Sequence, residues 1–234
     1  MTRLLCLPGL LCDERLWREM RFPGNVIHAD LTRDDDIVAM ATRALADAPE
    51  RFVAVGLSMG GIVAFQIARL APERLVGMIL LDTNPAADTD DKRVMRLRQE
   101  EAVRAGQLPQ IVAEELKPNY LAAANRTDAD LLGLTLAMAV GLGPDVFLRQ
   151  SAALRTRPDA WSVLPGITFP VLIACGAEDR LCPPDLHRRM ADAMPDAMLE
   201  IVDGAGHLTP LEQPEALNLA FERWIERNIV GELA

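Results

Sequence analysis

The segment Gly56-Leu-Ser-Met-Gly60 is a G-x-S-x-G pentapeptide, and one further glycine follows it. An apolar, β-branched run at 51–57 leads into the segment, and a helix-like apolar run at 62–70 leads out of it. This order predicts a sharp turn from a strand into a helix, where small residues remove Cβ clashes and the helix start offers unpaired N–H groups. Such a turn makes Ser58 a candidate nucleophile, whereas the alternative is a glycine-rich turn with an incidental serine.

A serine hydroxyl is a weak nucleophile at neutral pH, so it needs a base to take its proton and an acid to orient that base. His207 lies on a glycine-containing loop directly after the strand-like run 198–202. Asp179 comes just after the buried strand-like run 171–175. The chain order Ser58, Asp179, His207 is the one expected when a nucleophile elbow on a parallel sheet carries a triad.

Other histidines and carboxylates compete for these roles. His28 lies in a strand-like run and His187 in a helix-like run, so both fit the role of base less well than His207. Asp82 directly follows a strand-like run and is the alternative to Asp179 as the acid. We favour His207 and Asp179 and leave Asp82 open.

Three motifs resemble those of the α/β-hydrolase family, in particular its small bacterial, cap-bearing, carboxylesterase-like members: Gly56-Leu-Ser-Met-Gly60, Gly176-Ala-Glu-Asp179, and Gly206-His207 followed by Glu212 and Pro214. The resemblance covers nearly the whole chain. It implies that Ser58 attacks the substrate, that His207 relays the proton and that Asp179 orients His207.

An acyl-transfer site also needs N–H donors for the developing oxyanion. The N–H of Met59, at the start of the helix after the nucleophile, is expected to be one of them. The loop 8–13, which follows the strand-like run 3–7, resembles the family's His-Gly-x oxyanion loop with Pro8 in place of the histidine. That resemblance makes the N–H of Leu10 the second donor and leaves the packing role of the histidine to another group.

Strand-like and helix-like runs alternate along the chain. We expect strands at 3–7, 26–30, 52–57, 76–81, 170–175 and 198–202, and helices at 35–47, 60–70, 184–193 and 211–228. The alternation predicts an α/β fold with a mostly parallel sheet of about six strands and helices on both faces. Compared with the family, the usual N-terminal β-hairpin is expected to be missing.

The stretch 85–165 has no convincing strand and contains several helical runs broken by glycine and proline. It predicts a helical cap inserted into a core domain made of residues 1–84 and 166–234. In the family such a cap lies over the nucleophile and shapes the pocket. Its Arg149, Arg155 and Arg157 are candidates for holding a substrate carboxylate, although an exposed helix face is the favoured interpretation.

The net charge and the composition limit the kinds of molecule that this protein is expected to bind. The formal net charge is −10 and the pI is about 4.8, which argues against binding nucleic acid or an anionic membrane surface. The N-terminus lacks the pattern of a signal peptide, and the apolar run 131–142 is shorter than a membrane span, so a cytoplasmic protein is expected. The cysteines lack zinc-site spacing, and the proposed chemistry needs no metal or organic cofactor.

The residues and the resemblance together predict a serine hydrolase that cleaves carboxylic esters of small to medium acyl groups through an acyl-enzyme on Ser58. A serine at the elbow argues against chemistry that forms an alkyl-enzyme on a carboxylate. Hydrolysis of lactones, thioesters or carbon–carbon bonds by the same triad stays open. The alternative that the protein is a family member that binds a ligand without catalysing a reaction stays open as well. The sequence does not indicate an oligomeric state.

Overall fold

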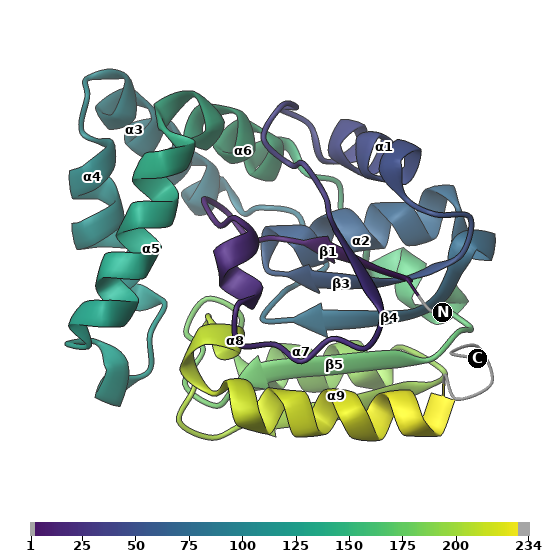
Figure 1. The fold of residues 1–234 in the computed structure, drawn as a ribbon. Coiled ribbons are helices and arrows are strands. Elements are labelled where there is room, and N and C mark those ends of the chain that lie inside the picture. The colour runs from purple at the N-terminus through teal and green to yellow at the C-terminus, as the bar shows by residue number, and fades with distance from the viewer. Residues whose placement is uncertain (1–2, 229–234) are drawn as a thin grey trace.

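The computed structural model describes residues 3–228, in which six strands form one parallel sheet in the order β2-β1-β3-β4-β5-β6 (Figure 1). The strands are β1 (Arg3–Leu7), β2 (Asn25–His28), β3 (Phe52–Leu57), β4 (Leu75–Leu81), β5 (Val171–Gly176) and β6 (Ala197–Val202). The helices are α1 (Ile37–Asp47), α2 (Met59–Leu70), α3 (Asp90–Arg104), α4 (Leu108–Gln110), α5 (Ala129–Leu142), α6 (Pro144–Thr156), α7 (Pro184–Asp192), α8 (Thr209–Glu212) and α9 (Pro214–Asn228). Shorter helical segments are η1 (Glu14–Trp17), η2 (Pro72–Arg74), η3 (Ile111–Leu116), η4 (Lys117–Asn119), η5 (Ala123–Asn125) and η6 (Trp161–Gly166).

The central strands are apolar along their whole length because they are covered on both sides. Every residue of β3, β4 and β5 is buried, which is the pattern of parallel strands beneath helices. Helix α2 packs against β1, β3 and β4, and helices α7 and α9 pack against β5 and β6. The predicted α/β fold with a parallel sheet of about six strands flanked by helices is confirmed.

All six strands run in the same direction, so the loops after their carboxyl ends meet at one edge of the sheet. Ser58 follows β3, Asp82 follows β4, and Asp179 and His207 lie on the loops after β5 and β6. The loop 8–13 follows β1 at the same edge. In Figure 1 the arrowheads of β3, β4 and β5 point toward the side where α3–α6 gather.

Between β4 and β5 the chain forms only helices, turns and loops. We call residues 85–165 the cap, the range proposed from the sequence. No single helix within residues 3–228 is long and apolar enough to cross a membrane; the pair α5 and α6 reaches that length only together, with a bend of 93° between them.

The predicted helix at 211–228 is wrong at its start. The structure has two helices there, α8 and α9, separated at Gln213. Pro214 disfavours the helical conformation at the residue before it, and Gln213 has φ −139° and ψ 58°. Glu212, at the end of α8, accepts the N–H groups of Gly206 and Leu208 on either side of His207.

Candidate active site

Ser58 lies at a tight turn between β3 and α2, in a backbone conformation that few non-glycine residues adopt. Its φ is 52° and its ψ is −112°, and its N–H donates to the carbonyl oxygen of Leu81 at 2.9 Å. A Cβ on Gly56 would lie 2.6 Å from the carbonyl oxygen of Gly60, and a Cβ on Gly60 would lie 1.9 Å from that of Leu7. The two glycines of the motif are therefore steric requirements of the turn that presents Ser58.

The structure brings together the three residues that the sequence proposed as a triad. The Oγ of Ser58 lies 2.8 Å from Nε2 of His207, and Nδ1 of His207 lies 2.8 Å from Oδ2 of Asp179. Oδ1 of Asp179 accepts the N–H groups of Leu181 at 2.8 Å and Cys182 at 3.0 Å, which fixes the carboxylate. With these bonds, Nδ1 of His207 donates to the carboxylate and Nε2 is free to accept a proton from the serine.

The surroundings of His207 favour its protonated form. Burial alone would lower the pKa of His207, but the charge of Asp179 and the hydrogen bond to it outweigh burial and, with Asp82, raise the pKa above its ordinary 6.5. The ring also packs against Tyr120, with ring centroids 5.3 Å apart. A base that gains affinity for a proton once it faces a carboxylate is suited to accept the serine proton.

Asp82 and His187 lie close to these residues but outside the chain of hydrogen bonds. The carboxylate of Asp82 accepts the N–H of Gly176 at 3.0 Å and the hydroxyl of Thr209 at 2.9 Å, and it has no hydrogen bond to His207. Burial, reinforced by the charge of Asp179, raises the pKa of Asp82 well above its ordinary value. The position of Asp82 is thus that of a brace between the ends of β4 and β5 and helix α8.

His187 is the buried histidine of helix α7. Its Nε2 accepts the N–H of Thr83 at 3.1 Å, and its Nδ1 donates to the carbonyl oxygen of Pro183 at 3.2 Å. Burial lowers the pKa of His187. Both ring nitrogens are therefore occupied, and the structure leaves this residue away from the serine hydroxyl.

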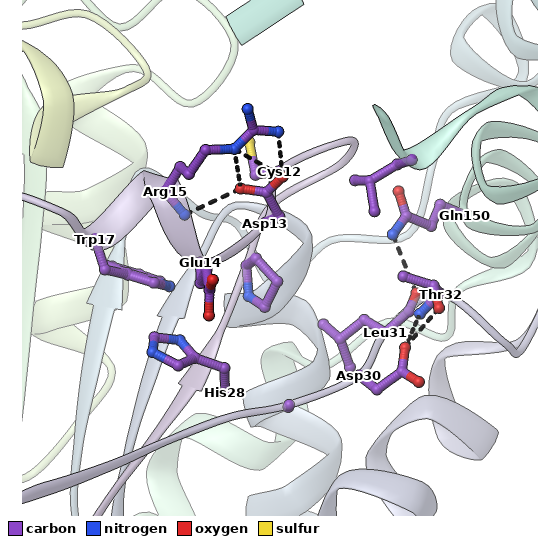
Figure 2. Close-up of a pocket in the computed structure, with 13 residues that line it drawn as sticks. Cys12, Asp13, Glu14, Arg15, Trp17, His28, Asp30, Leu31, Thr32 and Gln150 are labelled. Atoms are coloured by element: carbon purple, nitrogen blue, oxygen red, sulfur yellow. Dashed lines mark hydrogen bonds and ion pairs between the residues drawn. The ribbon is translucent and has the colours of Figure 1, made fainter. Parts of the chain in front are cut away.

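His28 lines a cavity to which Pro8, Cys12 and Asp13 of the loop 8–13 also contribute. This cavity has a volume of about 320 Å³, and Figure 2 shows His28 in it beside Trp17 and Glu14. Neither Ser58 nor His207 lines it. His28 is thus placed apart from the candidate nucleophile, as its weaker fit in the sequence suggests.

One of the two proposed oxyanion donors, Leu10, lines a very small cavity beside Ser58, and the other, Met59, directly follows Ser58 in the chain. The N–H of Met59 is the first of helix α2, so it has no partner within the helix, and the N–H of Leu10 has no hydrogen bond within residues 3–228. The cavity has a volume of about 10 Å³, roughly the room one water needs, and is lined by Gly9, Leu10, Cys12, Leu57, Ser58, Tyr120, His207 and Leu208. The N–H of Leu10 is therefore available to an oxygen atom held in this cavity.

A cap residue that the sequence did not single out supports the loop that carries Leu10. Oε1 of Gln150 accepts the N–H of Leu11 at 2.9 Å. Its Nε2 donates to the carbonyl oxygen of Leu31 at 3.0 Å, as Figure 2 shows. Gln150 is 1% exposed. It braces the loop in which Pro8 stands where the family carries a histidine.

The larger cavity over Ser58 has a volume of about 170 Å³ and lies between the core and the cap. Its lining residues are Leu10, Ser58, Ile62, Asn84, Lys92, Met95, Arg96, Gln99, Glu115, Leu116, Asn119, Tyr120, Leu154, Arg157, Leu181, Cys182 and His207. Of the three cap arginines proposed from the sequence, only Arg157 is among them. Nε of Arg149 donates to the carbonyl oxygen of Thr32 at 2.7 Å, and Arg155 pairs with Glu100 at 3.4 Å.

One group of side chains in the described part of the chain has the donor types of a metal site. Asp179, Cys182 and His207 each place a donor atom within 4.8 Å of the others. The hydrogen bond between His207 and Asp179 already uses two of these atoms. Burial raises the pKa of the Cys182 thiol to about 12, so the thiolate that would bind a metal is disfavoured. The geometry favours a proton relay here over ligation of an ion.

Comparisons with known proteins agree with this geometry. The structure is similar to that of a thermophilic esterase from Thermogutta terrifontis in its malate-bound form, with 28% identity, a TM-score of 0.85 and coverage of 97% of this chain and 90% of that one. The sequence is 31% identical over 186 residues to a pimeloyl-[acyl-carrier protein] methyl ester esterase from Pectobacterium atrosepticum, covering 76% of this chain and 71% of that protein. It is 27% identical to a putative carbamate hydrolase RutD from Yersinia enterocolitica, covering 72% of this chain and 61% of that protein. The model of the alpha/beta hydrolase family matches residues 4–220, and the chain therefore belongs to that family.

Proposed function

We propose that this protein is a serine hydrolase that cleaves carboxylic esters of small to medium acyl groups through an acyl-enzyme on Ser58. The observation that carries the proposal is the continuous chain of hydrogen bonds from Ser58 through His207 to Asp179, with both links at 2.8 Å. The esterases from Thermogutta terrifontis and Pectobacterium atrosepticum support the same class of reaction. The cavity of about 170 Å³ over the serine suits small to medium acyl groups.

In the proposed reaction, Nε2 of His207 takes the proton of Ser58 while Oγ bonds to the ester carbonyl carbon. The electron pair of the carbonyl bond moves onto its oxygen, where the N–H groups of Leu10 and Met59 stabilise it. The bond to the alcohol oxygen then breaks, and that oxygen takes the proton from His207. A water molecule next attacks the acyl-enzyme with His207 as base, which releases the acid and restores the serine.

Hydrolysis of p-nitrophenyl esters of increasing acyl length tests the proposal. We expect Ser58→Ala to lower kcat by about 10⁴-fold or more, and to abolish labelling by a fluorophosphonate, because the nucleophile is gone. Ser162→Ala is the matched control, since Ser162 is exposed on η6 and does not line the cavity. Activity should fall with acyl chains too long for the cavity.

The outcomes separate a hydrolase from a binding protein. An unaltered protein that neither reacts with the fluorophosphonate nor hydrolyses any ester, lactone or thioester would contradict the proposal and favour a ligand-binding role for the same pocket. Equal activity of the unaltered protein and Ser58→Ala would show that another group is the nucleophile.

A further inference from the structure

The cavity over the candidate nucleophile is bordered by three cationic side chains from the cap. Lys92 and Arg96 come from α3, and Arg157 comes from the segment after α6. Glu115 is the one carboxylate that lines this cavity in the described part of the chain, and it is paired with Arg98. A positive wall stands out in a chain whose net charge is −10.

Arg96 and Arg157 share a single buried carboxylate, that of Asp88. Nε of Arg96 lies 2.6 Å from Oδ2 of Asp88, and Nη1 of Arg157 lies 2.6 Å from Oδ1. The side chains of Asp88, Arg157 and Arg96 are 0%, 3% and 14% exposed. One carboxylate balances only one of two guanidinium groups, so the wall of the cavity keeps a positive charge in a place that is poorly screened by water.

The two arginines differ in what their remaining nitrogens do. Arg157 is held by the segment that follows β4, because its Nε donates to the carbonyl oxygen of Ala86 at 2.7 Å and its Nη2 to Oδ1 of Asn84 at 3.5 Å. The terminal nitrogens of Arg96 have no hydrogen bond within residues 3–228, although Nε is fixed by Asp88. Arg96, a lining residue of the cavity, therefore has two terminal nitrogens without hydrogen-bond partners in the described residues.

Lys92 adds a second free cation at the same wall. It lies four residues before Arg96 on α3, so the two side chains share one face of the helix. Its ammonium group has no hydrogen bond or ion pair in the part of the chain that the structure describes, and the residue is exposed. Lys92 thus lies toward the solvent side of the cavity, with Arg96 deeper.

We propose that Arg96, positioned by Asp88 and assisted by Lys92, binds a carboxylate of the substrate, so that the enzyme prefers esters whose acyl group ends in a carboxylate. This inference rests on the proposed ester hydrolysis at Ser58. A guanidinium with both terminal nitrogens free matches the two oxygens of a carboxylate, and charge-assisted bonds of this kind are strong where water is excluded. Asp88 and Arg157 are positioning residues in this arrangement.

Two esters of equal shape and different charge test the subsite. In p-nitrophenyl hydrogen adipate the acyl chain ends in a carboxylate, and in p-nitrophenyl 6-methylheptanoate an isopropyl group replaces it. We expect the unaltered protein to favour the adipate ester at least about 10-fold in kcat/KM. Arg96→Gln should lower kcat/KM for the adipate ester by about 10- to 100-fold, mainly through KM, and change that for the neutral ester by less than about threefold.

Arg93→Gln is the matched control, because Arg93 lies on the same helix, is exposed, pairs with Asp90 and does not line the cavity. It removes the same charge and should leave both esters unaffected. An equal loss on both esters in Arg96→Gln would show that Arg96 acts only in packing and would overturn the proposal. Equal rates on the two esters in the unaltered protein would overturn it as well.

Calorimetry with adipate on the Ser58→Ala protein separates this inference from the proposed function. If no ester is hydrolysed, the proposed function fails, and adipate binding decides the subsite by itself. Binding that Arg96→Gln weakens about 10-fold or more, and Arg93→Gln does not, supports the carboxylate subsite. Adipate binding that is absent, or unchanged by Arg96→Gln, would overturn it.

Discussion

The strand ends of the core and the helices of the cap hold their side chains in different ways. At the strand ends the backbone itself is constrained: Ser58 and Asp82 have φ of 52° and 48°, and a Cβ on Gly60 would lie 1.9 Å from a carbonyl oxygen. In the cap, a Cβ on Gly133 would meet nothing within 4 Å, and one on Gly141 would meet only a side-chain nitrogen of Arg15 at 3.7 Å. The core fixes the residues of the proposed chemistry through its backbone, whereas the cap presents its residues through side-chain contacts.

The cap is nevertheless joined to the core at the site. Glu212 of α8 accepts the N–H of Ala122 at 2.7 Å and that of Gly206 at 2.8 Å, and so connects the cap with the loop of His207. The N–H of His207 donates to the carbonyl oxygen of Tyr120. Under the proposed function, we expect reactivity to depend on the core and selectivity on the cap, and these hydrogen bonds join the two regions.

The largest effect is expected when the acid of the proposed triad is changed. Asp179→Asn removes the negative charge at Nδ1 of His207, so kcat should fall by about 10⁴-fold. Asp82→Asn changes a carboxylate with no hydrogen bond to His207 and should cost less than about tenfold. Steady-state kinetics on a p-nitrophenyl ester would measure both, and the reverse ranking would make Asp82 the acid.

The pH dependence of kcat/KM is a second test of the interaction between Asp179 and His207. The reaction needs neutral His207, and the pKa of His207 is raised above 6.5, so kcat/KM should decline as the pH falls through a value above 6.5. Asp179→Asn removes the main cause that raises this pKa. The residual activity of the variant should therefore persist to lower pH, and an unchanged acid limb would show that another group titrates.

Much of the core could be predicted from the sequence, because steric requirements restrict which residues can occupy particular positions there. The elbow requires glycine at positions 56 and 60, and parallel strands bring their carboxyl ends to one edge of the sheet. The order of Ser58, Asp179 and His207 along the chain therefore predicts that the three residues lie together. Asp82 was harder to rank, because it also follows a strand, and only its hydrogen bonds separate it from Asp179.

The sequence of the cap shows no comparable steric restriction. Helix α3 carries Arg93, Arg96 and Arg98, and their local sequence context does not say which faces the core. Arg96 is distinguished by its bond to Asp88, which lies eight residues earlier, just before α3 begins. Gln150 has the sequence context of an ordinary polar helix residue, and only its bond to the N–H of Leu11, 139 residues away, gives it a role. Side-chain pairing between segments, rather than the local pattern, decides these roles.

Glycine substitutions test the contrast in backbone constraint directly. Gly60→Ala places a Cβ against the carbonyl oxygen of Leu7, and we expect it to lower the free energy of unfolding by about 3 kcal/mol. Gly133→Ala lies in the exposed interior of α5 with nothing near the new Cβ, and should raise that free energy by about 0.5–1 kcal/mol. Urea unfolding of both variants would measure this, and equal effects would contradict the contrast.

An effect smaller than that of Gly60→Ala is expected from a buried cation of the cap. Lys117 is 2% exposed, its Nζ has no hydrogen-bond partner within residues 3–228, and it lies 5.0 Å from the ring centroid of Tyr120. Burial lowers the pKa of Lys117 below its ordinary 10.5, against the opposing effect of Cys12, so the charged form is costly in the folded protein. Between the lowered pKa and 10.5 the unfolded chain binds more protons, and stability should rise with pH across that window.

Lys117→Met keeps the length of the side chain and removes the charge, so it should raise the free energy of unfolding at pH 7 by about 1–2 kcal/mol. It should also abolish the rise in stability at alkaline pH, which urea unfolding at pH 7 and pH 10 would measure. Lys92→Met, at an exposed position, is the control and should show neither effect. A loss of stability in Lys117→Met would mean that the attraction between the ammonium and the Tyr120 ring exceeds the cost of burial, and that the cap, like the core, compensates its buried charges.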